Sequence, residues 1–394
     1  MPYGRATDVR DIQMLGHRSV YEEEHAIFRD TARRFASREI APNFERWEQA
    51  GIVDRDYWKR GGETGLLCAQ TPERYGGPGG DFRLNAIVIE ELWYAGFSGP
   101  AADYSVHSDV CCGYLLKFGT EDQKRHWLPR MVAGDVVCAI AMSEPGTGSD
   151  LKGIRTRAER DGDEYVINGQ KTFISNGQLC DLVIVVVRSG GSDNGSGMNL
   201  ILVETNRPGF RRGRNLEKLG HLSADTSEIF FDGVRVPVTN ILGAEGHAMS
   251  MLMSELPQER LTIALQSMAS AQKAFDITVA YVRQRKAFGT AIAAMQNTRF
   301  KLADLKADLA VGWAFIDQCL RQLVNGALTT YDASTAKLWA TEMHGRVVDQ
   351  CLQFFGGYGF MREYEICRLY ADARVQRIYG GTSEIMRELI SRDL

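Results

Sequence analysis

Apolar residues follow two different spacings along this chain. Near the C-terminal end they recur every three or four residues, which places them on one face of a long helix, at Leu302, Leu305, Leu309, Trp313, Ile316 and Leu320. Between residues 182 and 187 the run LVIVVV is continuous and rich in β-branched side chains, which predicts a buried strand. Residues 199–203 and 228–231 continue the strand pattern.

The order of these patterns predicts three regions. Residues 1–137 read as a helical domain, 138–245 as a β-domain and 246–394 as a second helical domain. Asp161-Gly162 and Asn168-Gly169 are hairpin signals, and no helical stretch separates the strands, so we expect them to be antiparallel. The predicted fold class is α+β: an N-terminal helical domain, a middle antiparallel β-domain and a C-terminal four-helix-type bundle.

Composition excludes several classes of function. The net charge is -4, which does not favour nucleic acid as a partner. The eight cysteines form no C-x-x-C pair and no zinc or iron–sulfur spacing, so no metal site is predicted. The chain contains no run of about 18 apolar residues, so no integral membrane segment is predicted. The first residues include Asp8 and Asp11 and have no apolar core, so we expect a cytoplasmic protein, with a processed organellar protein as the alternative.

Three glycine-containing segments are candidates for ligand binding. Residues 140–150 (IAMSEPGTGSD) offer backbone N–H groups but lack the third glycine of a dinucleotide fold. Residues 281–289 place arginines at a helix end, which suits a phosphate. Residues 353–359 allow the backbone to approach a flat ligand closely. Each has an ordinary alternative: a plain turn, a solvated helix end or a helix C-cap.

Taken together, five motifs resemble one family across nearly the whole chain. The flavin-dependent acyl-CoA dehydrogenases share their order and spacing, and the motifs here are AMSEPGTGSD (141–150), KTFISNG (171–177), RQRKAFG (283–289), QFFGGYGF (353–360) and IYGGTSEI (378–385). The chain is most similar to the long-chain branch, through ELPQER (255–260) and YGGTSEIMREL.

The resemblance implies a homotetramer that binds FAD and converts an acyl-CoA to the trans-2-enoyl-CoA, passing electrons to an electron-transfer flavoprotein. It implies that residues of this chain cover the flavin ring and hold its adenine and pyrophosphate end, the latter partly across a subunit boundary. The residues implied in these contacts are Ile140, Ala141, Met142, Ser143, Gly148, Ser149, Phe173, Ile174, Ser175, Arg285, Gln296, Gln353, Gly356, Gly357, Thr382, Ser383 and Glu384. The acyl-CoA thioester would contact Ser149, Pro257, Gln258, Arg260, Gly380 and Gly381.

The reaction also needs a carboxylate to remove the α-proton of the thioester and a hydrogen-bond donor for its oxygen. In many family members the carboxylate directly precedes G-T-S on the last turn, where this chain has Gly380. The long-chain and isovaleryl-type branches lack it too, and their base position corresponds to Glu259. The Gly380 N–H can still serve as the oxygen's donor.

The local sequence leaves alternatives for this base. Pro257 favours a first helical turn, so Glu259 would lie near a helix start, where acidic residues commonly only complement the helix dipole. Glu255 is a second candidate base, and Arg260 would orient the carboxylate. For the whole chain, the alternatives are an acyl-CoA oxidase that uses O₂ and an inactive acyl-CoA-binding relative. The branch resemblance suggests long or branched acyl chains, although the isovaleryl type, which shares the base position, takes short ones.

Overall fold

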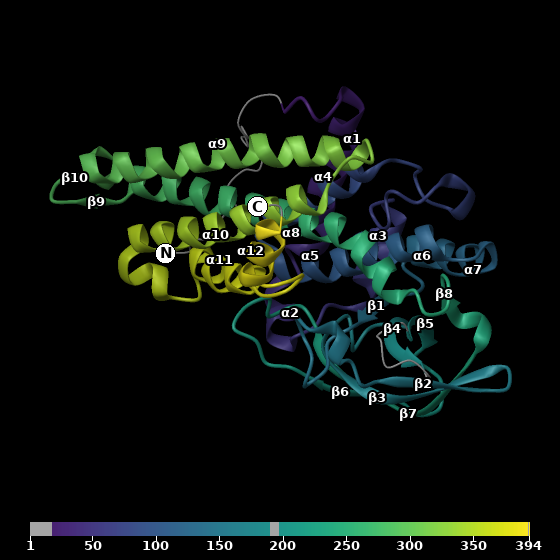
Figure 1. The fold of residues 1–394 in the computed structure, drawn as a ribbon. Coiled ribbons are helices and arrows are strands. Elements are labelled where there is room, and N and C mark those ends of the chain that lie inside the picture. Colours follow the sequence, from purple (N-terminus) through teal and green to yellow (C-terminus); the bar gives the residue numbers. More distant parts are fainter. Residues whose placement is uncertain (1–17, 190–196, 393) are drawn as a thin grey trace.

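Helices come first and last along the chain, with a β-sheet between them, in a computed structural model that describes residues 18–189, 197–392 and 394. The sheet forms one end of the molecule, and the two helical regions lie side by side across it (Figure 1). The predicted order of helices, strands and helices is confirmed. Asp8 and Asp11, on which the expectation about targeting rests, lie outside the described residues.

The N-terminal helices are short and enclose mostly apolar side chains. Pro42 follows the end of the first helical stretch, and Thr120 opens the last helix with a capping box, accepting from the Gln123 N–H while the Gln123 side chain accepts from the Thr120 N–H. The helices are α1 (Glu23–Phe35), α2 (Phe44–Ala50), α3 (Arg55–Glu63), α4 (Phe82–Tyr94), α5 (Ser98–Ser105), α6 (Cys112–Phe118) and α7 (Glu121–Val132).

The middle region is one sheet of mixed strand direction. Its order is β6-β7-β3-β2-β4-β5-β8, and β1 pairs with β4. The expectation of a purely antiparallel sheet is wrong, because β1 and β2 both run parallel to β4. Parallel strands need a crossover connection, and here the β2–β3 hairpin and its flanking loops provide it instead of a helix. The strands are β1 (Cys138–Ala141), β2 (Arg157–Asp161), β3 (Glu164–Ser175), β4 (Leu182–Ser189), β5 (Met198–Glu204), β6 (Phe210–Asn215), β7 (Thr226–Pro237) and β8 (Ile241–Leu242).

Only one of the two predicted hairpin signals forms a turn. Gly162 has φ +63° in the turn between β2 and β3, as expected. Asn168-Gly169 instead lies inside β3, at an irregularity in its pairing with β7. A Cβ at Gly169 would collide with Thr156, so the glycine is needed for close approach and not for a turn.

Long helices dominate the C-terminal region. The apolar stripe predicted from residue 302 to 320 lies on α9, where Leu305, Leu309, Trp313, Ile316 and Leu320 are buried. Helix α10 packs against α8, α9, α11 and α12. The elements are α8 (Ala248–Gln284), the small hairpin β9 (Lys286–Ala287) and β10 (Thr290–Ala291), α9 (Gln296–Val324), α10 (Thr330–Phe355), α11 (Glu365–Ala373) and α12 (Ser383–Ser391). Across the described residues, we find no helix with the length and apolar character to cross a membrane.

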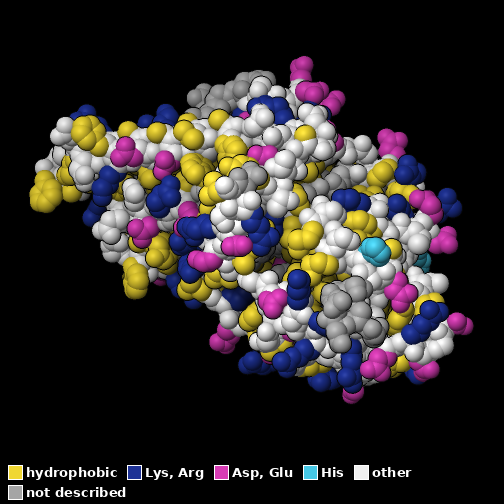
Figure 2. All heavy atoms as spheres, viewed as in Figure 1, with side chains coloured by type: hydrophobic (Ala, Val, Ile, Leu, Met, Phe, Trp, Pro, Cys, Tyr) yellow, Lys and Arg dark blue, Asp and Glu magenta, His cyan; other side chains and the backbone are white. Residues whose placement is uncertain are grey.

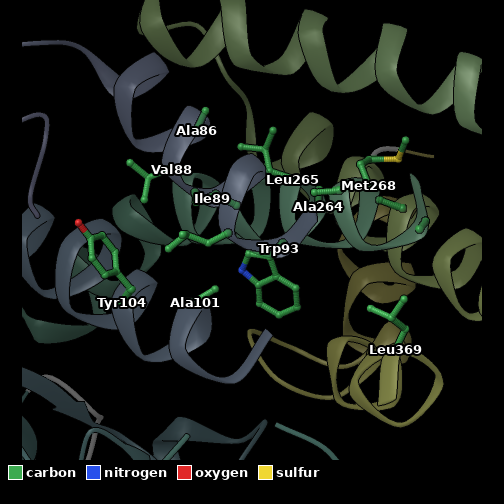
Figure 3. Close-up of a cluster of buried hydrophobic side chains, with 14 of the residues drawn as sticks. Ala86, Val88, Ile89, Trp93, Ala101, Tyr104, Ala264, Leu265, Met268 and Leu369 are labelled. Atoms are coloured by element: carbon green, nitrogen blue, oxygen red, sulfur yellow. The ribbon is translucent and has the colours of Figure 1, made fainter. Parts of the chain in front are cut away.

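The two helical regions share one hydrophobic core. Ala86, Val88, Ile89 and Trp93 of α4 and Ala101 and Tyr104 of α5 belong to the same buried cluster as Ala264, Leu265 and Met268 of α8 (Figure 3). Helix α8 therefore runs through the interior between regions that are far apart in the sequence. Any polar side chain on its inward face is removed from water.

Leu265→Ala should destabilise the protein through this shared core. Leu265 is fully buried, so the lost apolar contacts and the resulting cavity are expected to cost about 2–5 kcal/mol. The midpoint of thermal unfolding should fall clearly. Leu219→Ala is the control, because Leu219 is 72% exposed and its truncation should leave the midpoint nearly unchanged. Equal midpoints for the two variants would contradict the proposed role of α8 in the core.

Candidate active site

Glu259 lies on the buried face of α8. Its side chain is only 9% exposed, and its Oε1 accepts a hydrogen bond of 3.0 Å from the hydroxyl of Tyr114 on α6. Burial raises the pKa of Glu259 to about 7, with Glu255 adding to the rise, while the Tyr114 hydrogen bond and the Arg260 charge oppose it. A carboxyl group with this pKa can both accept and release a proton near neutral pH.

Glu259 does not lie in a first helical turn. Helix α8 begins at Ala248, about three turns earlier, and Pro257 is inside the helix. The prediction from Pro257 is wrong because residues 248–256 also favour a helix, so the proline is accommodated within it and the Met253 carbonyl loses its intrahelical donor. The dipole of the helix start therefore does not act on Glu259, and burial controls its pKa.

Glu255, the second candidate base, has a different environment. It lies one turn before Glu259 and forms an ion pair of 2.6 Å with Lys117, whose side chain is half exposed. The Lys117 ammonium and the Ser254 hydroxyl both contact Oε1 of Glu255, so this oxygen is already occupied. Its charge also helps to raise the pKa of Glu259.

The first of the two glycines of the last turn, Gly380, packs directly against α8, and the second, Gly381, packs against α12. Gly380 and Gly381 have φ values of +61° and +92°. A Cβ on Gly380 would collide with Cδ1 of Ile263, one helical turn after Glu259. The turn can approach the helix this closely only because it lacks side chains. The structure thus brings Gly380 to the same stretch of α8 as Glu259, although 120 residues separate them in the sequence.

Arg260 is buried beside this turn. Its guanidinium donates a hydrogen bond of 3.3 Å to the Ser334 hydroxyl on α10. Burial lowers the pKa of Arg260, and the neighbouring Glu259 opposes this effect. This side-chain hydrogen bond goes to Ser334 and not to Glu259, so the role of orienting the carboxylate stays a prediction.

A pocket of about 430 Å³ lies next to Glu259. Helices α6 and α8 and the loop after α9 form its walls, with the residues Gln70, Gly113, Leu116, Lys117, Ser254, Glu255, Pro257, Gln258, Leu323, Gly326 and Leu328. Gly113 adjoins Tyr114, the hydrogen-bond partner of Glu259. Predicted substrate residues Pro257 and Gln258 thus line a pocket beside the candidate base.

The loop after β1 is clamped by a buried ion pair. Lys171 of β3 contacts Glu144 at 2.9 Å and donates to the Met142 carbonyl at 3.0 Å. Glu144 also accepts from the backbone N–H groups of Arg155 and Thr156. This clamp lies at the base of the segment 145–150, which is exposed except at Thr147. Losing either partner would leave a buried charge unpaired.

The predicted flavin-covering residues of the β-domain divide into exposed, partly buried and fully buried groups. Phe173 is 69% exposed with φ +60°, and Gly148 and Ser149 are also exposed. A hydrogen bond from the Thr172 N–H to the Ser143 carbonyl joins the two segments. Ala141 and Ile174 instead point their side chains into the sheet core, so only their backbone could face a ligand. Ile140, Met142, Ser143 and Ser175 are partly buried.

A second pocket, also about 430 Å³, forms where α8 and α10 end. It brings together Arg285, Gln353, Gly356 and Gly357. The stacked rings of Tyr281 and Phe355, with centroids 4.1 Å apart, form part of its wall. Gln296 is exposed at the start of α9 and is not among the lining residues.

The residues after the glycine turn begin α12. Thr382 caps this helix by accepting from the Ile385 N–H, and Ser383 donates to Glu342 at 2.7 Å. Glu384 is 80% exposed near Arg387. Charged side chains of both signs gather over α10 and α12 in the middle of one face (Figure 2). Glu384 is not buried as a base would need to be.

Several residues of this site were not identified from the sequence. Tyr114 carries no local signal, because a tyrosine in an apolar helix usually belongs to the core. Glu144 and Lys171 lie inside the quoted motifs, but their pairing depends on the fold. Lys337 is a lone cation among the small residues Ala333, Ala336 and Ala340 of α10, and a buried lysine there could have been suspected from this spacing.

Comparisons with known proteins agree with this geometry. Family models match along the chain: acyl-CoA dehydrogenase N-terminal domain at residues 22–135, middle domain at 139–234 and C-terminal domain at 246–394. A long-chain specific mitochondrial acyl-CoA dehydrogenase of Sus scrofa is 46% identical over 96% of this chain and 88% of its own length. An isovaleryl-CoA dehydrogenase of Oryza sativa is 34% identical over 95% of this chain and 92% of its own.

Solved structures give the same result. The acyl-CoA dehydrogenase from Geobacillus kaustophilus has a TM-score of 0.92 and 42% identity, covering 95% of this chain and 98% of that one. An acyl-CoA dehydrogenase from Bacillus anthracis, described as complexed with FAD, has a TM-score of 0.88 and 29% identity, covering 95% and 67%.

Tyr114→Phe should raise the pKa of Glu259 above its value of about 7, because it removes a hydrogen bond that favours the charged carboxylate. Infrared difference spectra of the protein labelled with ¹³C-glutamate, using Glu259→Gln to assign the band, would give the midpoint of its titration. Tyr165→Phe is the control, since Tyr165 donates to Glu245 in the β-domain. An unchanged or lower midpoint in Tyr114→Phe would contradict the assignment.

Proposed function

The chain belongs to the acyl-CoA dehydrogenase family, and we propose that it dehydrogenates a long-chain or branched acyl-CoA between the α and β carbons to give the trans-2-enoyl-CoA. One observation carries the proposal. A desolvated carboxyl group, Glu259, lies one helical turn before Ile263, the residue against which Gly380 packs, and Gly380 occupies the position where many relatives carry the carboxylate. The chain therefore keeps a base of suitable pKa although the last turn has none.

The exposed loops fit FAD as the cofactor. A Cβ built at Gly148, Gly356 or Gly357 would meet nothing within 4 Å, so the backbone there is open to a flat or phosphate-bearing ligand. Arg285 supplies a positive charge at the second pocket. We propose that the segments around Ser149 and Phe173 cover the ring and that the second pocket takes an adenine and pyrophosphate end. When bound, FAD accepts the hydride that leaves the β-carbon.

The chain's own residues supply the proton chemistry. Glu259 takes the α-proton on its carboxylate, and burial makes it a stronger base than a solvated glutamate. Tyr114 donates to Oε1 and fixes the orientation of the group. The Gly380 N–H donates to the thioester oxygen as negative charge develops there.

The first pocket suits the entry of the substrate. It combines the side-chain amides of Gln70 and Gln258 and the Ser254 hydroxyl with apolar leucines. An acyl-CoA carries amides along its pantetheine arm, and these need hydrogen-bond partners where the arm leaves water. We therefore propose that this arm lies in the first pocket, with the thioester next to Glu259.

The substrate class and the partners rest on the relatives. The long-chain relative favours a long acyl chain, whereas the isovaleryl relative shows that this family also includes enzymes named for a short branched substrate. We propose an electron-transfer flavoprotein as the acceptor and a homotetramer as the assembly. Phe288, fully exposed at the β9–β10 hairpin, and Phe360, 80% exposed near the second pocket, support a subunit contact there.

Glu259→Gln should abolish reduction of the bound flavin by acyl-CoA, with a loss of at least about 10²–10⁴-fold, because an amide cannot accept the α-proton. Anaerobic stopped-flow absorbance measures the rate. Bound FAD and acyl-CoA affinity should be retained. Glu255→Gln is the matched variant and should keep most of the rate. If reduction survives in Glu259→Gln and disappears in Glu255→Gln, the base is Glu255.

Straight-chain acyl-CoAs of graded length, together with branched ones, test the substrate class. We expect anaerobic flavin reduction with a maximum of kcat/KM at long or branched chains. Flavin that stays oxidised with every acyl-CoA would contradict the proposed activity. Rapid peroxide formation in air would identify an acyl-CoA oxidase instead.

A further inference from the structure

Lys337 is a buried cation directly behind the glycine turn. It lies on α10 and is 0% exposed. Its ammonium donates to the Gly381 carbonyl at 2.7 Å and to the Gln376 carbonyl at 3.2 Å. These two carbonyls lie at the two ends of the segment 376–381. A single side chain therefore ties both ends of this segment to α10.

The same segment is also fixed to α8. The Ser267 hydroxyl donates to the Gln376 side chain, and the Tyr379 hydroxyl donates to Gln266 at 3.2 Å. Ile263 fills the space beside Gly380. The glycines themselves supply no side chain to hold the turn, so its shape depends on these neighbours.

Burying the positive charge of Lys337 costs desolvation free energy that its contacts do not fully offset. Both of its hydrogen-bond acceptors are neutral carbonyls, and burial together with the nearby Arg260 charge lowers the pKa of Lys337 to about 8. A methionine or leucine would fill the same space without a desolvation cost. The Cε atom of Lys337 would lie 3.5 Å from a Cβ at Gly380, so the charge is next to the donor that the thioester oxygen needs.

We propose that Lys337 is a positioning residue for removal of the α-proton: its ammonium fixes the Gly380–Gly381 turn and places a positive charge behind the Gly380 N–H. This role rests on the proposed function. The substrate oxygen becomes negative as Glu259 takes the proton, and a fixed charge in a dry site stabilises that change at no reorganisation cost. Arg260, which is also buried and positively charged, would add to the effect of this charge from the α8 side.

The first test compares Lys337→Met with Lys124→Met, a lysine on α7 remote from the turn. We expect kcat to fall about 10- to 100-fold in Lys337→Met, somewhat less than the loss for a direct oxyanion donor. KM should change by less than about threefold, because the interaction strengthens only as the charge develops. Lys124→Met should match the wild type. A kcat for Lys337→Met within about twofold of the wild type would overturn the proposal.

A 3-thia-acyl-CoA separates proton removal from oxidation. Sulfur replaces its β-carbon, so no β-hydride can leave, but Glu259 can still remove the α-proton and return a deuteron from D₂O. NMR of the α-position measures this exchange. We expect it to slow in Lys337→Met by the same factor as kcat. Unchanged exchange in Lys337→Met would contradict the proposal, whereas no exchange in the wild type would contradict the proposed function instead.

Amide hydrogen exchange of the unliganded protein tests the anchoring role without any reaction. Peptides that cover 376–386 should exchange faster in Lys337→Met and not in Lys124→Met. This expectation does not depend on the proposed function, because the measurement involves no substrate and no reaction. If Lys337→Met does not fold, Lys337→Gln replaces it, since the amide can still donate to a carbonyl but carries no charge. We expect Lys337→Gln to keep slow amide exchange in the turn, whereas its α-proton exchange should slow as in Lys337→Met. A wild-type rate of α-proton exchange in Lys337→Gln would overturn the proposed role of the charge.

Discussion

A carboxyl group held away from water is the constraint on which the active site depends. Glu259 is buried because α8 runs between two helical regions that share one core, and not because of any feature of its own neighbours in sequence. Desolvation is the main cause of its raised pKa, and Tyr114 and Arg260 limit the rise so that the group can still ionise near neutral pH. The packing that stabilises the fold therefore also gives this side chain the raised pKa that its proposed role as the base requires.

The shape of the last turn also depends on contacts with α8. Gly380 allows the backbone to lie against Ile263, and Lys337 and Ser267 hold the turn from α10 and α8. A chain that had a glutamate in place of Gly380 would carry its base on this turn; here the turn retains only a backbone N–H. In the proposed mechanism the base and the donor thus come from separate elements, α8 and the turn that packs against it.

Much of the fold could be predicted from the sequence, because the spacing of apolar residues reports burial. The stripe on α9 and the strand at 182–187 are examples. Errors arose where tertiary contacts override a local signal. Pro257 is tolerated inside α8, Asn168-Gly169 serves a close approach to Thr156 within β3, and β4 receives parallel partners from both β1 and β2. Glu259 could be inferred as the candidate base only from family resemblance. Tyr114 carries no local signal, and the small residues around Lys337 indicate only that it is buried, so the contacts of both required the coordinates.

The most direct test is a crystal structure of the protein loaded with FAD and an acyl-CoA analogue that cannot be oxidised. The account predicts that an oxygen of Glu259 lies about 3–3.5 Å from the α-carbon, the separation expected of groups poised to react, with the thioester oxygen facing the Gly380 N–H. An α-carbon next to Glu255 or Glu384, with Glu259 still enclosed against Tyr114 and out of reach, would contradict it.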